Sequence, residues 1–143
     1  MKKFYISIAT IILSFLLFFG GLVAGKTIYN KPTREVLIGY DNTNYPGQID
    51  YRKKITDIKD QWTIDNLQQI FMGSKQIEFE NITRAKPDVH IKIKSPKAFV
   101  TLTHSDIWFN EEGALIKIGE DDYRTINIGD AAAIKKMIDY KSP

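Results

Sequence analysis

The sequence predicts an α+β fold: an N-terminal transmembrane or signal helix, followed by an antiparallel meander sheet with two helices on one face. The first observation behind this prediction is a 22-residue stretch without charge, at residues 4–25. The second is the spacing of apolar residues, which runs in the order strand, helix, several closely spaced strands, helix. That order suits an antiparallel sheet covered on one face better than a parallel sheet built from alternating units.

The composition limits the possible chemistry of this 143-residue chain. It has 20 Lys and Arg, 17 Asp and Glu, two His and no Cys. The absence of Cys excludes a disulfide scaffold, a thiolate metal site and a cysteine nucleophile. Lys2 and Lys3 supply most of the net positive charge, so the rest of the chain is nearly neutral and we expect no nucleic-acid partner.

Residues 1–25 are predicted to be a transmembrane anchor or a signal peptide. A bilayer core of about 30 Å needs roughly 20 helical residues, and the uncharged stretch after Lys2 and Lys3 is long enough to span it. Small residues at 23–25 also offer a site for signal peptidase, so cleavage stays open. Retention of the two lysines inside the cell would place the following domain on the extracytoplasmic side, although Lys26 and Lys31 reduce the charge difference.

Two extended segments and a helix are expected after a short tether at residues 26–33. Residues 34–143 are predicted to form the extracytoplasmic α+β domain. Alternation indicates a strand at 33–40, and an extended pattern resumes at 49–55 after a turn-rich loop. Helical spacing then predicts a helix that Asp57 or Asp60 can cap and that ends near Gly73. Its expected buried stripe is Ile58, Trp62, Leu67, Ile70 and Phe71.

Short strands dominate the second half. Residues 88–94 alternate throughout, with Val89, Ile91 and Ile93 expected on the buried face. Further strands are expected at 76–79, 98–103, 107–109, 114–118 and 123–126, with Val100 and Leu102 inward and a break at 105–106. Gly113 can take the left-handed conformation in a hairpin loop at 110–113.

A last helix is expected at 131–140. Asp130 is expected to cap it, and Ile134, Met137 and Ile138 form its apolar stripe.

No catalytic, metal-binding or cofactor-binding residue is predicted. His90 lies on the polar phase of its strand and is expected to face solvent, and neither histidine has ligands at a recognisable metal spacing. His104 and Ser105 are interpreted as a turn pair, because adjacency alone does not make a nucleophile and its base converge. The carboxylates at 111–112 and 120–122 are expected at opposite edges of the sheet, which disfavours a paired-carboxylate enzyme.

A candidate interaction surface can be named from aromatic and basic residues. Phe99 and Trp108 take the phase opposite to the expected inward residues and would form a contact surface if that face is open. The alternative is that both are core residues after a one-residue slip in strand phase. Arg52, Lys53 and Lys54 are the densest basic run, which could contact anionic lipid or wall polymer, or protect an edge strand from unwanted pairing.

The general layout resembles small extracytoplasmic proteins, membrane-anchored or secreted, of low-GC Gram-positive bacteria. The resemblance rests on the MKK start, the apolar N-terminus, the acid-tipped meander with Gly113 and Tyr123 in its hairpins, and the final AAxIKKMID segment. It implies a location at the cell membrane, or secretion if the signal is cleaved. It implies no activity and transfers no site residue.

We therefore expect a membrane-anchored extracytoplasmic binding or interaction domain without catalysis. Its expected partners are the membrane, through residues 4–25, and an envelope protein or wall polymer. The alternative is an exported enzyme inhibitor or toxin-immunity protein, which rests on fold analogy alone. A small surface hydrolase that uses Asp or Glu residues is a third possibility.

Overall fold

The computed structural model of the chain describes residues 2–78 and 86–140. The chain divides into two compact units, residues 1–31 and 32–143, which are described separately.

The first unit is one helix, α1 (Lys2–Tyr29). Its segment Tyr5–Tyr29 has 25 residues and contains an 18-residue stretch with a mean hydropathy of 2.5, none of which is buried. A helix of this length and composition can cross a membrane, and a signal sequence has the same properties. The helix continues to Tyr29, so it includes the first four residues of the segment predicted as a tether, residues 26–33. Pro32, three residues after the end of the helix, is a residue that a helix interior does not tolerate.

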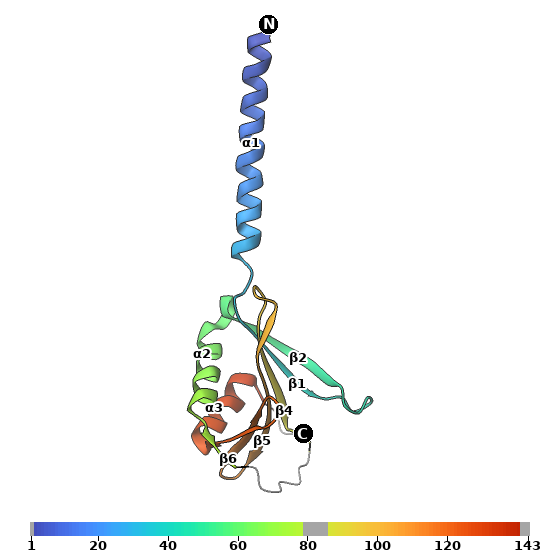
Figure 1. Ribbon diagram of the computed structural model, residues 1–143, viewed down its shortest axis with the longest axis vertical. Coiled ribbons are helices and arrows are strands. Elements are labelled where there is room, and N and C mark those ends of the chain that lie inside the picture. The colour runs from blue at the N-terminus through green and yellow to red at the C-terminus, as the bar shows by residue number, and fades with distance from the viewer. Residues whose placement is uncertain (1, 79–85, 141–143) are drawn as a thin grey trace. The chain divides into compact units, whose positions relative to one another are not determined.

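The second unit contains one seven-stranded antiparallel sheet (Figure 1). Its strand order is β2-β1-β4-β5-β6-β7-β3. The predicted meander is present as β4 to β7, and the β1–β2 hairpin is added beside β4 while β3 pairs with β7 at the other edge. The strands are β1 (Glu35–Asp41), β2 (Ile49–Thr56), β3 (Lys75–Gln76), β4 (Val89–Ser95), β5 (Val100–Asn110), β6 (Gly113–Ile118) and β7 (Asp122–Asn127).

Strand β5 differs from its prediction. It runs without the expected break at 105–106. Val100 and Leu102, which were predicted to point inward, are 47% and 49% exposed. The pairing also has a bulge: Ile93 pairs with Thr103 but Lys94 pairs with Thr101, which leaves Leu102 as an extra residue. Because Ser105 and Ile107 are the buried residues of the continuous strand, alternation does not put Leu102 on the core face.

Helix α2 (Asp57–Gly73) is kinked near its start. Asp60 has non-helical dihedral angles (φ −153°, ψ 73°), and its Oδ1 accepts a hydrogen bond of 3.0 Å from the Thr63 amide. Asp60 therefore caps the main part of the helix, as one of the two predicted alternatives. Ile58 lies before the kink and Trp62 lies on the face of the main helix opposite to Ile64 and Leu67, and both are exposed, so their prediction as core residues was wrong.

Helix α3 (Ile128–Ile138) begins one turn earlier than predicted. Its cap is Asn127, whose Oδ1 accepts a 2.9 Å bond from the Asp130 amide, so the prediction of Asp130 as the cap was wrong. The Asp130 carboxylate instead accepts a 2.8 Å bond from Asn127 Nδ2, which makes the pair reciprocal. Ile134 and Ile138 are buried as predicted.

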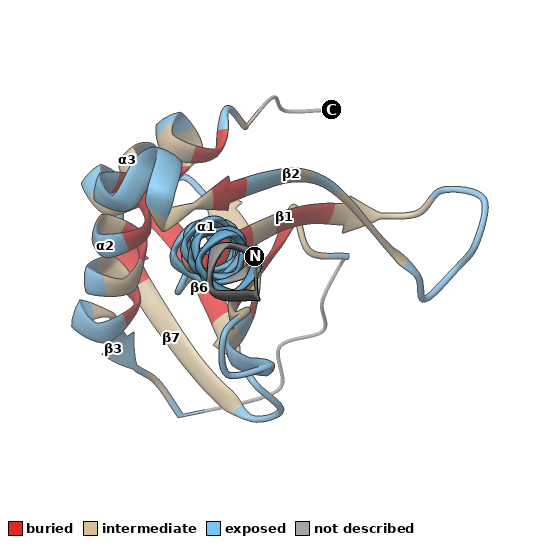
Figure 2. Cartoon of the chain, turned by 90° about the horizontal axis from the view of Figure 1, so that it is seen from above, coloured by how far each residue is buried: buried red, intermediate tan, exposed pale blue. Residues whose placement is uncertain are grey.

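Both helices of this unit contribute to one hydrophobic core, so they cover the same face of the sheet. Figure 2 shows the buried residues where α2 and α3 meet the strands. The predicted inward residues of β4 are all fully buried. The core consists of Val36, Ile38, Ile55, Ile64, Leu67, Phe71, Val89, Ile91, Ile93, Ile107, Ala114, Ile116, Ile126, Ala131, Ile134 and Ile138.

Asp57 ties the start of β1 to the start of α2, and we predict that Asp57→Ala destabilises the domain at neutral pH. The carboxylate accepts bonds of 3.1 Å from the Thr33 amide and 3.0 Å from the Arg34 amide, and it also contacts the Thr33 hydroxyl. Burial raises the pKa of Asp57, but these bonds outweigh burial and leave the pKa below its usual value. The expected loss is about 1–2 kcal/mol, because the carboxylate is partly exposed.

The sign of the pH dependence follows from the lowered pKa of Asp57. Its stabilisation is complete above the unfolded-state value of about 4 and is lost as the pH falls through the lower folded-state value. Urea unfolding of the wild type and Asp57→Ala at pH 7 and pH 3 measures this difference. Equal differences at both pH values would contradict the prediction.

Candidate functional site

The strand register aligns polar side chains across the face of the sheet opposite to the core. His90 pairs with Gly39 on one side and with Asp106 on the other, and Asp106 pairs with Lys117. Because side chains alternate along a strand, these residues point away from the face that carries Ile91 and Ile107. We call this the outer face, defined by Tyr51, His90, Lys92, His104, Asp106 and Lys117.

His90 lies between two aspartates on the outer face. Its Nδ1 is 2.7 Å from Asp106 Oδ1, and its Nε2 is 3.1 Å from Asp41 Oδ1. The side chain is only 7% exposed, so the prediction of a solvent-facing histidine was wrong. The alternation placed His90 on the correct face, but the end of β1 and the middle of β5 cover it there.

The two aspartates determine the protonation of His90. Burial lowers the pKa of His90, but the hydrogen bonds and charges of Asp106 and Asp41 outweigh burial and raise it. The bond to His90 in turn lowers the pKa of Asp106. A histidine donates from both nitrogens only as an imidazolium, so the two carboxylates favour the positively charged ring.

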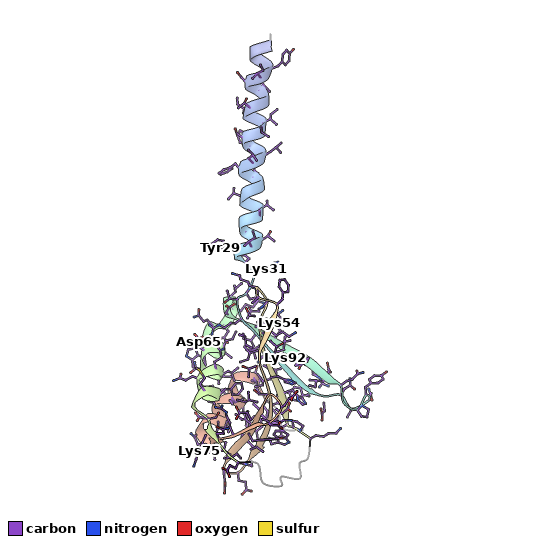
Figure 3. All side chains as sticks on the ribbon, in the orientation of Figure 1. Tyr29, Lys31, Lys54, Asp65, Lys75 and Lys92 are labelled. Carbon is purple, nitrogen blue, oxygen red and sulfur yellow. The ribbon has the colours of Figure 1, made fainter. Side chains whose placement is uncertain are left out.

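His104 completes a cluster with this pair. It precedes Asp106 by two residues on β5 and therefore faces the same side, with its Nε2 3.8 Å from Asp106 Oδ1. Burial, assisted by Lys92, which pairs with His104 in register, lowers the pKa of His104 and favours the neutral ring. Figure 3 labels Lys92 on its strand. His90, His104 and Asp106 offer three ligand atoms that lie within 4.8 Å of one another.

Ser105 does not belong to this cluster. It lies within β5, so the interpretation of His104 and Ser105 as a turn pair was wrong. Ser105 is fully buried on the core face, while its neighbour His104 is on the outer face. Its hydroxyl has no hydrogen-bond partner among the described residues.

We predict that Ser105→Ala leaves the stability of the domain unchanged or increases it by up to about 1 kcal/mol. A buried hydroxyl without a partner costs desolvation energy that a methyl group does not cost. Urea unfolding of the wild type and the variant measures the effect. A loss of stability above about 1 kcal/mol would show that the hydroxyl makes a favourable interaction.

The structure does not bring together the predicted aromatic pair. Phe99 is 91% exposed in the turn before β5, where its φ of 55° is left-handed. Trp108 is half-buried near the other end of β5, opposite Leu115. Nine residues of extended chain separate the two by roughly 30 Å, so they cannot form one small contact site.

The predicted basic run lies on β2, which is an edge strand. Arg52 pairs with Asp50 at 2.8 Å, Lys53 with Asp139 and Lys54 with Glu35. Lys53 Nζ also lies 3.5 Å from the carbonyl oxygen of Met137 in α3, so it points to the helix side of the sheet. The run is thus divided between partners and does not form a separate cationic patch.

The carboxylates of the turns also stay apart, as predicted. Glu111 and Glu112 lie in the β5–β6 turn, and Glu120 and Asp121 lie in the β6–β7 turn at the opposite end of β6. A cavity of about 430 Å³ next to the β5–β6 turn is lined by Glu112 among other residues. Its other polar lining residues include Lys75, Asn127 and Asp130, and the last two are already paired as the cap of α3.

Comparisons with known proteins give no match: no family model, no curated protein sequence and no solved structure is similar to the chain. The site therefore has to be interpreted from its own geometry. Sequence reasoning missed the cluster of His90, Asp106, Asp41 and His104, because only the strand register brings these residues together. The one local signal was the spacing of His104 and Asp106, two residues apart in a segment that could be a strand.

Proposed function

We propose that the protein is a membrane-anchored extracytoplasmic binding domain without catalysis. The observation that carries the proposal is the apolar segment Tyr5–Tyr29, whose side chains find no burial in the protein and which precedes a separately folded unit. Apolar surface of this extent is unfavourable in water and favourable in a bilayer. Lys2 and Lys3 favour an N-terminus inside the cell, and the folded unit then lies outside.

The outer face is the proposed binding surface. Both α2 and α3 pack on the opposite face, so the exposed His104 and the partly exposed Lys92 and Lys117 are left for contacts with other molecules. Ser105 and His104 lie on opposite faces of the sheet, and the carboxylates of the two turns lie at opposite ends of β6. Neither pair can act together on a substrate, which supports binding over hydrolysis.

Cell fractionation tests the membrane part of this proposal. Cells expressing a C-terminally tagged chain are treated with protease from outside, and the mass of the recovered protein is measured. A full-length, membrane-bound and externally digested product supports the proposal. A protected domain would overturn the extracytoplasmic side, and a shortened product in the medium would overturn the anchor.

A matched variant makes the fractionation specific. Leu17→Arg places a charge in the middle of the apolar segment, which costs about 2.5–3.5 kcal/mol on insertion. Thr27→Arg places the same charge near the end of the helix, where the cost is much lower. We expect the first substitution, and not the second, to reduce the membrane-bound fraction.

The absence of catalysis is tested with purified protein. Hydrolysis of wall or peptide substrates, at a rate that a single substitution on the outer face abolishes, would overturn that part of the proposal.

A further inference from the structure

We propose that His90, His104 and Asp106 bind one divalent transition-metal ion of the Zn²⁺ class on the outer face. This inference does not depend on membrane anchoring or on which partner the domain binds. It rests on three donor atoms, two from imidazoles and one from a carboxylate, that lie within 4.8 Å of one another.

The distances between these atoms are close to those of a metal site. Bonds of about 2.0–2.2 Å to a tetrahedral ion place ligand atoms roughly 3.3–3.5 Å apart. Asp106 Oδ1 is 2.7 Å from His90 Nδ1 and 3.8 Å from His104 Nε2, one shorter and one longer than that spacing. The two histidine nitrogens lie at most 4.8 Å apart, so shifts of about 1–1.5 Å or less would form the site, and the ligands stand on neighbouring strands that limit larger movements.

Asp41 provides the outer support that a metal-binding histidine needs. A ligating imidazole usually donates its other ring N–H to a carboxylate, which fixes the orientation of the ring. His90 Nε2 faces Asp41 Oδ1 at 3.1 Å, while its Nδ1 faces the other two ligands. A bound ion would replace the proton between His90 and Asp106 and leave the bond to Asp41 intact.

The donor set selects the class of ion. Imidazole nitrogen suits Zn²⁺, Cu²⁺, Ni²⁺ and related ions, whereas Ca²⁺ and Mg²⁺ require several oxygen ligands. Asp106 and Asp41 together balance a divalent charge. Lys117 beside Asp106 and Lys86, whose Nζ is 4.0 Å from Asp41 Oδ2, prevent the excess of negative charge that typically attracts hard cations.

Metal titration of the full-length protein tests the proposal. The protein is purified in nonionic detergent with a histidine-free tag, treated with EDTA and dialysed, and Zn²⁺ is added during isothermal titration calorimetry. We expect one Zn²⁺ per chain. Absence of stoichiometric binding would overturn the proposal.

Three variants assign the ligands. His104→Ala should weaken Zn²⁺ binding by at least tenfold, and it should keep the fold because this side chain is 42% exposed. Asp41→Asn should weaken binding by roughly 10- to 100-fold through the orientation of His90. Asp121→Asn, an exposed carboxylate in the β6–β7 turn, is the matched control and should bind as the wild type does.

A spectroscopic measurement separates ligation from a merely structural effect. Co²⁺ added to the wild type should give visible absorption bands of a four-coordinate ion, with water as the fourth ligand, and His104→Ala should change them. Unchanged Zn²⁺ affinity and an unchanged Co²⁺ spectrum in His104→Ala would overturn the proposed ligand set. Displacement of Zn²⁺ by equimolar Ca²⁺ would overturn the proposed class of ion.

Discussion

Gly113→Ala is expected to destabilise the domain by about 3–5 kcal/mol or to prevent its folding. Gly113 has a φ of 144°, which side chains rarely adopt, and a Cβ atom there would lie 2.0 Å from the carbonyl oxygen of Ile126. The unfavourable dihedral angle costs about 1–3 kcal/mol, and the overlap with the backbone of β7 costs about as much again. The neighbouring strand cannot move away without losing its pairing with β6.

Gly119→Ala is the matched control for this prediction. Gly119 lies in the next turn of the meander with a φ of 68°, but no atom lies within 4 Å of the position of its Cβ. Only the dihedral cost of about 1–2 kcal/mol is expected there. Urea unfolding of the full-length protein, followed by tryptophan fluorescence, measures both variants. Equal losses for the two glycines would contradict the close approach at Gly113.

Local patterns predicted the β5–β6 hairpin correctly. The hairpin at 110–113 was predicted from a glycine between two alternating segments. The strand with Val89, Ile91 and Ile93 was predicted from the alternation of apolar and polar residues. These features depend on residues close together in the chain. They could be predicted because side-chain alternation and turn chemistry act over a few residues.

The site around His90 could not be predicted in this way. His90 lies 16 residues from Asp106 and 49 residues from Asp41 in the chain. Their meeting depends on which strands are neighbours and in which register they pair, and a slip of one residue would move every side chain to the other face. No local pattern in the sequence determines that β4 pairs with β1.

The kink in α2 shows a second limit of local patterns. Ile58 and Trp62 are four residues apart, as on one helical face, yet both are exposed. Asp60 interrupts the helix between them, and in the main helix Trp62 lies opposite to Ile64 and Leu67. Predicting a buried face from the spacing of apolar residues assumes a continuous helix, so it does not account for a kink. The same aspartate was identified as a possible cap, which is the chemical cause of the interruption.

Ile91→Ala and Leu102→Ala are expected to differ strongly in their effects, although the sequence pattern predicts both as core residues. Ile91 is fully buried in β4 at the centre of the sheet. Its truncation removes buried methyl groups and leaves a cavity between the sheet and the helices, so the expected loss is about 2–5 kcal/mol. Ile91→Val, which removes one methylene, should cost only about 0.5–1.5 kcal/mol.

Leu102→Ala should cost less than about 1 kcal/mol, because Leu102 is already 49% exposed to solvent. Urea midpoints at an unchanged slope of the unfolding transition report these differences as stability alone. A loss at Leu102 that equals the loss at Ile91 would contradict the exposure of Leu102 and would mean that its side chain packs in the core.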